Sequence, residues 1–340
     1  MGNVAFTGVA GLGPFRQMCD AIGDGALRRV LAKEGVPARL LELPEGAIPL
    51  PAMFGLFDRA ARMAGEDLFG LRLGQRMTPT DFGLWARYVV SAPDLAAMIR
   101  RAERTVGYHQ PGASLTLESR GEFVVLRYRA SFQGGRGRTH HTDHVLSPLT
   151  QCIRRYAGQH WAPTWIELDY PRPRHWRRLE EALGVPAVFD CPGTGLVFSP
   201  ALLELKSISA PPPRAAVTIA DLRRVISRRP PRTMSNAIRQ LLIFDSEGGC
   251  YDMESITRLL QRSNRSIQRD LQLEGVSFRQ ILAEARRAEA ERLVGGTENS
   301  LEEIAWHLGY SEHAHFTRAF RNSVGISPSA YRERIRRARG

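Results

Sequence analysis

The sequence predicts two folds in one chain: an α+β N-terminal domain, followed by an all-α domain built from two tandem helix-turn-helix units. In the first two thirds of the 340 residues, segments with strand periodicity alternate with segments with helix periodicity, an order typical of α+β domains. In the last third the periodicity is helical, and the pattern of helix, tight turn and helix occurs twice. The chain is long enough for two or three ordinary domains.

Prolines mark the expected boundary between the two folds. They are consecutive at 211–213 and again at 230–231, and consecutive prolines stiffen and extend a chain. We therefore expect the N-terminal domain at residues 1–210, a linker at 211–232 and the tandem helix-turn-helix domain at 233–340.

Helices open the N-terminal domain. From about Phe15 to Gly74 the apolar residues recur at helical spacing, and prolines mark the loops between the helices. A further helix is expected to begin at Ser91, because Asp94 follows three residues later and Pro93 suits a first helical turn.

Strand periodicity follows. Residues 115–129 contain two alternating runs separated by a turn, which predicts a β-hairpin. Residues 166–170 predict another strand, and residues 188–198, interrupted by a Pro-Gly pair, predict a second hairpin. Helices are expected between these strands, at 144–156 and 176–183.

The most informative motif is S-L-E-E-I-A-W-H-L-G-Y-S-E-H-A-H-F-T-R-A-F-R, residues 300–321. The apolar face of its first helix ends at Leu308, and Gly309 is suited to stop that helix because glycine readily adopts a left-handed conformation. We expect Ser311 to cap the second helix by accepting a backbone hydrogen bond.

The second helix of this motif is expected to pack through one face only. Phe316 and Phe320 lie four residues apart and would hold it against the first helix. The second helix of such a unit can enter the major groove of DNA, where outward side chains contact base edges. The outward candidates are His313, Thr317 and Arg318.

A second copy of the pattern lies upstream. An apolar helix face at 256–260 is followed by Ser263, a candidate N-cap, and by a helix whose Ile267 and Leu271 face inward. Arginine can make a two-pronged contact to guanine, and glutamine to adenine. The side chains on the opposite face are Arg265, Gln268 and Arg269.

A long helix is expected between the two copies, at 278–294, where strong helix formers predominate. It would span roughly 25 Å at 1.5 Å per residue. Such a spacer can hold two recognition helices about one duplex turn, ~34 Å, apart. Its expected apolar stripe is Ile281, Ala285, Ala288 and Leu293.

Composition favours a polyanionic partner. The chain has 47 basic and 35 acidic residues, a net charge of +12 and a pI near 10.3. A high genomic G+C content would also enrich arginine, so the arginine count alone does not identify nucleic acid.

The cysteines indicate a reducing compartment. They lie far apart without C-x-x-C spacing, so we expect reduced thiols rather than disulfides or zinc ligands. The sequence also lacks a signal peptide and a run of about 18 apolar residues, and we expect a soluble, cytoplasmic protein with no membrane contact. The four cysteines are Cys19, Cys152, Cys191 and Cys250.

The C-terminal part resembles the tandem helix-turn-helix DNA-binding domain of the AraC/XylS transcription regulators. The resemblance covers roughly residues 235–334 and is carried by E-E-I-A-W-H-L-G-Y-S-E-H-A-H-F-T-R-A-F-R and G-I-S-P-S-A-Y-R. One position departs from the family: Asp270 stands where a basic residue is common, and an acid beside the phosphates would weaken the first unit's grip. The resemblance implies base-reading roles for Arg265, Gln268, Arg269, His313, Thr317 and Arg318.

Residues 15 to about 205 resemble the effector-binding and dimerisation region of one AraC/XylS subgroup, which bears an arabinose-binding-type label. The runs D-L-F-G-L-R-L-G from Asp67 and D-F-G-L-W-A-R-Y from Asp81 carry this resemblance. The effectors of the subgroup are diverse, so arabinose is not inferred. The resemblance implies a homodimeric regulator, more commonly an activator, whose partners are double-stranded promoter DNA, an unidentified small-molecule effector and RNA polymerase.

Two other functions stay open. Some DNA-repair alkyl-transfer enzymes share this DNA-binding domain, but that chemistry needs an activated cysteine, and none of the four lies in a recognisable basic or metal-ligand motif. A ligand-independent DNA binder is the other alternative. No catalytic or cofactor motif is present, so we expect no catalytic residue, cofactor or metal.

Two further groups of residues have competing interpretations. The run T-H-H-T-D-H at 139–144 could offer zinc ligands, but an exposed polar start of a helix explains it better. Aromatic side chains could line an effector pocket, although residues at such spacings usually belong to a core. These aromatics are Trp85, Tyr88, Trp161 and Trp165.

Overall fold

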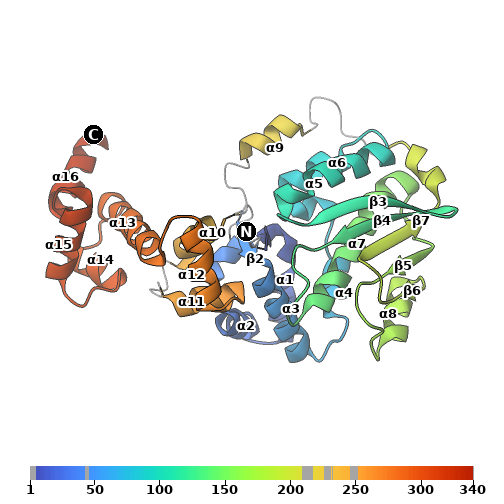
Figure 1. The fold of residues 1–340 in the computed structure, drawn as a ribbon, viewed down its shortest axis with the longest axis horizontal. Helices are drawn as coiled ribbons and strands as arrows, with labels where there is room; N and C mark the ends of the chain where they lie inside the picture. The colour runs from blue at the N-terminus through green and yellow to red at the C-terminus, as the bar shows by residue number, and fades with distance from the viewer. Residues whose placement is uncertain are drawn as a thin grey trace. The chain divides into compact units, whose positions relative to one another are not determined.

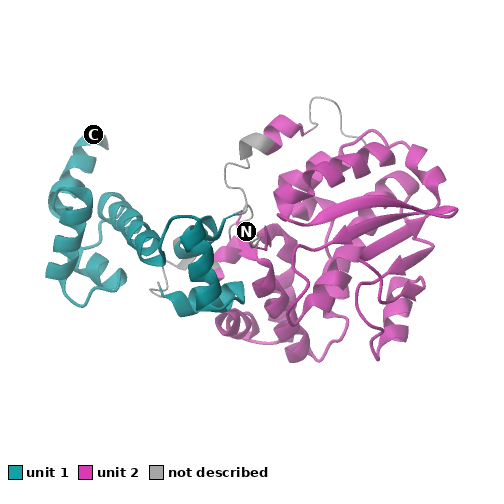
Figure 2. Ribbon diagram, viewed as in Figure 1, with its two compact units in different colours: residues 1–4, 231–340 teal, residues 5–230 magenta. Residues whose placement is uncertain are grey.

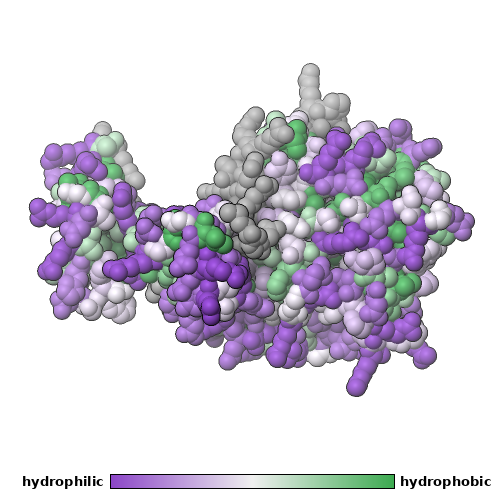
Figure 3. Space-filling view, viewed as in Figure 1, coloured by the Kyte–Doolittle hydropathy of each residue, from purple (hydrophilic) through white to green (hydrophobic). Residues whose placement is uncertain are grey.

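The computed structural model describes residues 5–42, 46–208, 217–225, 231, 233–245 and 252–339. The chain forms two compact units, residues 5–230 and residues 231–340 (Figure 2). Side chains on the visible face of both units are mostly hydrophilic, with hydrophobic ones in smaller patches (Figure 3). Among the described residues, no helix combines the length and the apolar character that a membrane span requires. Most of the expected linker and Cys250 lie outside these residues.

The N-terminal unit has an α+β fold, as the sequence predicted (Figure 1). Short 3₁₀ helices lie at Val9–Leu12, Ala38–Glu42, Pro79–Phe82 and Pro200–Glu204. Its helices are α1 (Phe15–Ile22), α2 (Ala26–Glu34), α3 (Leu50–Ala64), α4 (Phe69–Gln75), α5 (Gly83–Val90), α6 (Leu95–His109), α7 (Arg138–Ala157), α8 (Trp176–Leu183) and α9 (Ile219–Val225). Its strands are β1 (Phe6–Gly8), β2 (Ala47–Pro49), β3 (Ser114–Arg120), β4 (Phe123–Arg129), β5 (Trp165–Glu167), β6 (Ala187–Val188) and β7 (Thr194–Phe198).

The expected start of a helix at Ser91 is wrong. Asp94 is the N-cap of α6, and its side chain accepts a hydrogen bond from the Ala97 amide at 2.8 Å. Ser91 instead ends α5, where its hydroxyl donates to the Tyr88 carbonyl at 2.9 Å. Pro93 therefore precedes the cap rather than lying in the first turn.

The main sheet has the strand order β3-β4-β7-β5-β6. The β3–β4 hairpin is confirmed, with Ser114 opposite Arg129. The second hairpin, expected at 188–198, is wrong: β7 pairs antiparallel with β4 and β5, whereas β6 pairs parallel with β5. Every residue of β7 is buried, which suits a central strand with both edges paired, and the two-residue β6 takes the sheet edge.

Two glycines bring α4 against α7. A Cβ atom at Gly70 or Gly74 would collide with the carbonyl groups of His140 and His144 in α7. The two glycines lie four residues apart, on one face of α4. The close approach buries this part of α7, and the histidine-rich run that it carries becomes part of the interior.

The described residues of the C-terminal unit form helices and the turns between them, and the two predicted helix-turn-helix units are confirmed. The helices of the first unit rest on α10, whose first two amides, of Met234 and Ser235, donate to the Glu274 carboxylate at 2.7 and 2.9 Å. The helices are α10 (Met234–Asp245), α11 (Met253–Leu260), α12 (Asn264–Leu273), α13 (Phe278–Gly296), α14 (Leu301–His307), α15 (His313–Val324) and α16 (Pro328–Arg339).

Candidate nucleic-acid interface and ligand cavity

The turn between α14 and α15 shows how the local sequence places the second helix. A reciprocal capping box starts α14: Ser300 accepts from the Glu303 amide at 3.1 Å, and the Ser300 amide donates to the Glu303 carboxylate at 2.7 Å. Gly309 then adopts a φ of +80°, the left-handed conformation predicted for the helix stop. The predicted cap at Ser311 is wrong, because α15 begins at His313 with Glu312 as its N-cap and without a side-chain cap hydrogen bond.

The inner face of α15 is made of two phenylalanines. Phe316 and Phe320 are 1% and 2% exposed, and their ring centroids lie 5.8 Å apart. They pack in one cluster with the apolar residues of α14 and the end of α13. The outer face of the helix is thereby fixed by burial of the inner face.

The three candidates of the second unit lie together on that outer face. His313 and Arg318 are exposed and Thr317 is half-buried. The Thr317 hydroxyl and the His313 Nε2 atom are 3.4 Å apart, within hydrogen-bonding distance. This contact orients both side chains on the first turns of α15.

The first unit has the same arrangement. Gln261 ends α11 with a φ of +48°, and Ser263 caps α12 as predicted, accepting from the Ser266 amide at 3.3 Å. Ile267 and Leu271 are buried. The three candidates on the opposite side are all exposed: Arg265, Gln268 and Arg269.

Asp270 is not exposed on the outer face of α12, contrary to the expectation from the sequence. Its side chain is 8% exposed and forms an ion pair with Arg262, with 2.7 Å between Nη1 and Oδ2. Arg262 also donates to the Ser266 hydroxyl at 2.5 Å. Asp270 therefore stabilises the turn before α12 through its ion pair with Arg262. Its charge is neutralised by this pair and is not exposed on the outer face of the helix.

The spacer helix α13 contacts the two units with different faces. Ile281 is fully buried near its start, and Ala290, Leu293 and Val294 join the core of the second unit near its end. Ile281 and Ala290 are nine residues, or two and a half turns, apart, so they lie on opposite sides. The single stripe expected from the sequence is wrong for this reason, and Ala288 is exposed.

Two guanidinium groups on the recognition faces are free of ion pairs. Neither Arg265 nor Arg318 has a salt-bridge partner among the residues that the structure describes, whereas Arg269 lies 3.8 Å from Asp270. Each helix-turn-helix unit thus presents at least one exposed arginine without a salt bridge on its second helix, and on α15 the described Arg321 is another. Such a group keeps all its donors for a phosphate or a guanine.

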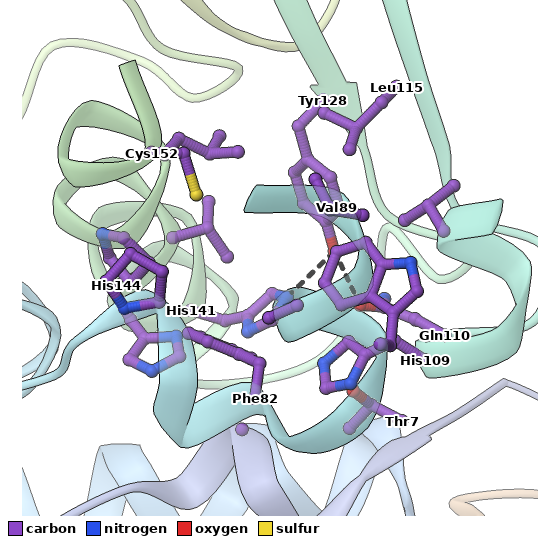
Figure 4. Close-up of a pocket in the computed structure, with 18 of the residues that line it drawn as sticks. Thr7, Phe82, Val89, His109, Gln110, Leu115, Tyr128, His141, His144 and Cys152 are labelled. Atoms are coloured by element: carbon purple, nitrogen blue, oxygen red, sulfur yellow. Dashed lines mark hydrogen bonds between the residues drawn. The ribbon is translucent and has the colours of Figure 1, made fainter. Parts of the chain in front are cut away.

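A second candidate site is a cavity of about 80 Å³ inside the N-terminal unit, between α5, α6, α7 and the β3–β4 hairpin (Figure 4). Trp85 lines it, as one of the predicted pocket aromatics, whereas Tyr88, Trp161 and Trp165 do not. Trp161 and Trp165 instead contact Phe198 and Phe123.

The expectation that residues 139–144 form an exposed helix start is wrong. His141 and His144 are 4% and 1% exposed, line the cavity and stack at 5.9 Å. Burial lowers the pKa of His144 to about 3 and holds that of His141 well below its usual value, so both are neutral. Asp143, on the other side of α7, accepts a hydrogen bond from the Tyr170 hydroxyl at 2.5 Å, and burial raises its pKa to about 7.

The described cysteines are poor nucleophiles. Burial raises the pKa of Cys19 and of Cys152 to about 12, and burial also raises the pKa of Cys191. A transferase cysteine needs the opposite shift, because the thiolate is the attacking form. These three thiols therefore give no support to the alkyl-transfer alternative.

Comparison with protein families gives two matches. Residues 25–207, more than half of the chain, match the model described as the arabinose-binding domain of AraC transcription regulators. Residues 256–334 match a helix-turn-helix domain model.

Similar proteins are transcription regulators. The ornithine utilization regulator of Pseudomonas aeruginosa is 28% identical over 304 residues, 88% of each chain. An uncharacterized HTH-type transcriptional regulator of Mycobacterium tuberculosis is 24% identical over 331 residues, 94% of this chain and 95% of that protein. The crystal structure of the transcriptional regulator CdpR from Pseudomonas aeruginosa aligns over 90% of this chain and 96% of that one, at 20% identity and a TM-score of 0.40.

Proposed function

Because the chain belongs to the AraC family of transcription regulators, we propose that α12 and α15 read the base sequence of promoter DNA under the control of a small molecule bound in the N-terminal unit. The observation that carries the proposal is that each of these helices has an exposed arginine without a salt bridge to any described residue, Arg265 on α12 and Arg318 on α15. We assign the effector domain to residues 1–210, the linker to 211–232 and the reading domain to 233–340.

The outer faces of the two helices suit base contacts of different kinds. Arginine offers a rigid fork of donors that matches the O6 and N7 atoms of guanine, so Arg265 and Arg318 are assigned to guanine. Gln268 is assigned to adenine, which a primary amide can contact with one donor and one acceptor. His313 and Thr317, held together at 3.4 Å, present a donor and an acceptor to one neighbouring base edge, and Arg269 is assigned to base or phosphate beside Gln268.

The proposed partners follow from this role. We place the regulator in the cytoplasm as a homodimer that contacts RNA polymerase and activates transcription. A more distant relative, 25% identical over 118 residues, is named as an activator: the transcriptional activator RhrA of Rhizobium meliloti. The effector shifts the population between two conformations and must bind one of them better, because equal affinity shifts nothing. A metabolite panel that changes neither melting temperature nor DNA affinity would favour the ligand-independent alternative.

Substitution of Arg318 by alanine tests the assignment of α15. On a DNA site selected from a random pool by the wild-type protein, the variant should lose about 1–3 kcal/mol of binding free energy and accept other bases at one position. The comparison is a titration of labelled DNA by gel shift or fluorescence anisotropy. Arg178→Ala is the matched control, because Arg178 is an exposed arginine of the N-terminal unit. Equal affinities of both variants would remove Arg318 from the reading surface.

The phosphate contacts predict a steep dependence on salt. The logarithm of the association constant should fall linearly with the logarithm of salt concentration, at a slope of about 0.9 per neutralised phosphate. Arg318→Ala should change affinity more on the selected site than on random DNA, since it removes a base contact rather than only a phosphate contact. A slope near zero would exclude binding through the basic face of the reading domain.

A further inference from the structure

The lining of the N-terminal cavity contains no ionic side chain. Among the described residues that line it, none is Asp, Glu, Lys or Arg. Its walls are mainly apolar carbon, including Met53, Val89 and Leu149. A charged ligand would lose its hydration there without gaining an opposite charge, at a cost of several kcal/mol.

The histidines do not supply a charge either. Burial lowers the pKa of His109 to about 4 and that of His144 to about 3, and it holds the pKa of His141 well below its usual value. Near neutral pH all three are uncharged imidazoles. The cavity therefore offers only neutral hydrogen-bonding groups.

Among the described residues that line the cavity, three nitrogen atoms have no hydrogen-bond partner: Gln110 Nε2, His141 Nδ1 and His144 Nδ1. The Tyr128 hydroxyl donates to Gln110 Oε1 at 2.8 Å and lies 3.1 Å from His141 Nε2 (Figure 4). Because the single hydroxyl proton is used toward Gln110, His141 must donate from Nε2, which leaves its Nδ1 as an acceptor. Neither Gln110 Nε2 nor His141 Nδ1 has a hydrogen-bond partner among the described residues, although Gln110 is only 3% and His141 4% exposed.

One wall of the cavity is aromatic. Trp85 stacks on His109 with ring centroids 5.1 Å apart and an interplanar angle of 14°, and Phe82 meets the same imidazole edge-on at 5.3 Å. Flat apolar groups pack well against such a wall. The volume of about 80 Å³ sets the size. It is roughly half of the ~150 Å³ of an engineered apolar cavity that holds one benzene, so one ring is the upper limit and its entry requires the lining side chains to shift.

We propose that the effector is a small uncharged molecule with one ring and one group that both donates and accepts a hydrogen bond, such as a phenol, an aromatic alcohol or a primary amide. Its oxygen accepts from Gln110 Nε2 and its hydrogen goes to His141 Nδ1, which satisfies two of the three unpartnered nitrogen atoms. Sugars carry too many hydroxyls for this lining, and amino acids carry charges that it cannot pair. This inference rests on the proposed role of the N-terminal unit as the effector domain.

The test titrates the full-length protein with uncharged and polar probes. Phenol, benzyl alcohol and benzamide are compared with D-glucose and L-lysine by isothermal calorimetry and by the shift in melting temperature. At least one of the three aromatic probes should bind saturably and raise the melting temperature, and the other two compounds should do neither. Absence of saturable binding by all three aromatic probes overturns the proposal, whatever the polar compounds do.

A substitution at Gln110 separates hydrogen bonding from simple filling of the cavity. In Gln110→Leu the affinity for the bound aromatic probe should fall about tenfold, as expected for one lost hydrogen bond in a buried site. Benzene, which makes no hydrogen bond, should bind the variant at least as well as the wild type and so reports that the cavity is intact. Gln133→Leu, at an exposed glutamine, is the control and should leave both affinities unchanged.

The outcomes distinguish this inference from the proposed function. If Gln110→Leu binds the probe as the wild type does, or if the variant loses benzene together with the probe, the assignment to this hydrogen-bonding pair is overturned. Saturable binding of D-glucose or L-lysine without the aromatic probes overturns the ligand class and leaves a ligand-controlled regulator in place. If the ligand-free protein selects no DNA sequence, the proposed function is contradicted, whereas the inference about the ligand class of the cavity is not affected.

Discussion

Replacing Arg127 with methionine is expected to lower the free energy of unfolding of the N-terminal unit by about 3–5 kcal/mol, the typical cost of removing one partner of a buried ion pair. The Arg127 side chain is 4% exposed. It donates to Glu167 and to Glu118, each at 2.7 Å, and to the Gly193 carbonyl at 3.1 Å. Glu167 is fully buried, so loss of Arg127 leaves this carboxylate with Arg120 as its remaining ion-pair partner.

The sheet is built around this ion pair. Arg127 lies opposite Gly195 on β7; a Cβ at Gly195 would collide with Val125 Cγ1 at 2.7 Å and would lie at contact distance, 3.4 Å, from Arg127 and Glu167. The glycine therefore leaves room for the Val125 side chain, which packs beside the charged pair. The alternation in residues 115–129 predicted the hairpin, but it could not show that the face of β4 that carries Arg127 is covered as well.

The measurement is chemical denaturation followed by circular dichroism and by tryptophan fluorescence. Arg104→Met, at an exposed arginine of the same unit, should change stability by less than about 0.5 kcal/mol. In the double variant Arg127→Met/Glu167→Leu both buried charges are gone, and part of the lost stability should return. A loss below about 1 kcal/mol for Arg127→Met would show that Glu167 is solvated or satisfied without Arg127.

Replacing Phe316 with alanine is expected to cost the second helix-turn-helix unit about 3–5 kcal/mol, the usual range for removal of a fully buried phenylalanine. The ring is 1% exposed and contacts Tyr310 and Phe320, with centroid distances of 5.7 and 5.8 Å. Whole domains are stable by only about 5–15 kcal/mol. Most of the stability that holds α15 against α14 would therefore be lost, and specific DNA binding with it.

Leu273→Ala is the matched control, because Leu273 is an apolar residue of α12 that is 65% exposed. Its effect on the melting temperature should be within experimental error, since surface substitutions away from special features change stability by about 0.5 kcal/mol or less. Thermal melting and DNA titration of the two variants are compared side by side. Wild-type DNA affinity in Phe316→Ala would contradict the assignment of α15 as a reading helix.

Local signals in the sequence predicted the two helix-turn-helix units of the reading domain, but not the cap of α15 or the packing of α13. Gly309 and Ser263 stop and start helices where predicted, and the inward residues of α12 and α15 follow from their four-residue spacing. The role of Asp270 was missed, because an acid on a helix can be neutralised from the preceding turn. Arg262, eight residues earlier, provides that neutralisation.

The features that the sequence did not predict depend on contacts between residues far apart in the chain. His141 and His144 of α7 are buried because Gly70 and Gly74 allow α7 to pack closely against α4. The residues in this contact are about seventy positions apart in the sequence. The pair of small residues in D-L-F-G-L-R-L-G was the available signal. The place of β7 between β4 and β5 likewise depends on its partners, since a run of apolar residues does not specify which strands it joins.

The measurement that tests the central claim most directly is parallel selection of DNA from a random pool by the wild-type protein, Arg265→Ala and Arg318→Ala. The wild type should select two conserved segments about one duplex turn, ~10 base pairs, apart. Each variant should lose base preference in one segment and keep it in the other. Loss of preference at the same segment in both variants, or unchanged selection in either, would contradict the account of two separate reading helices.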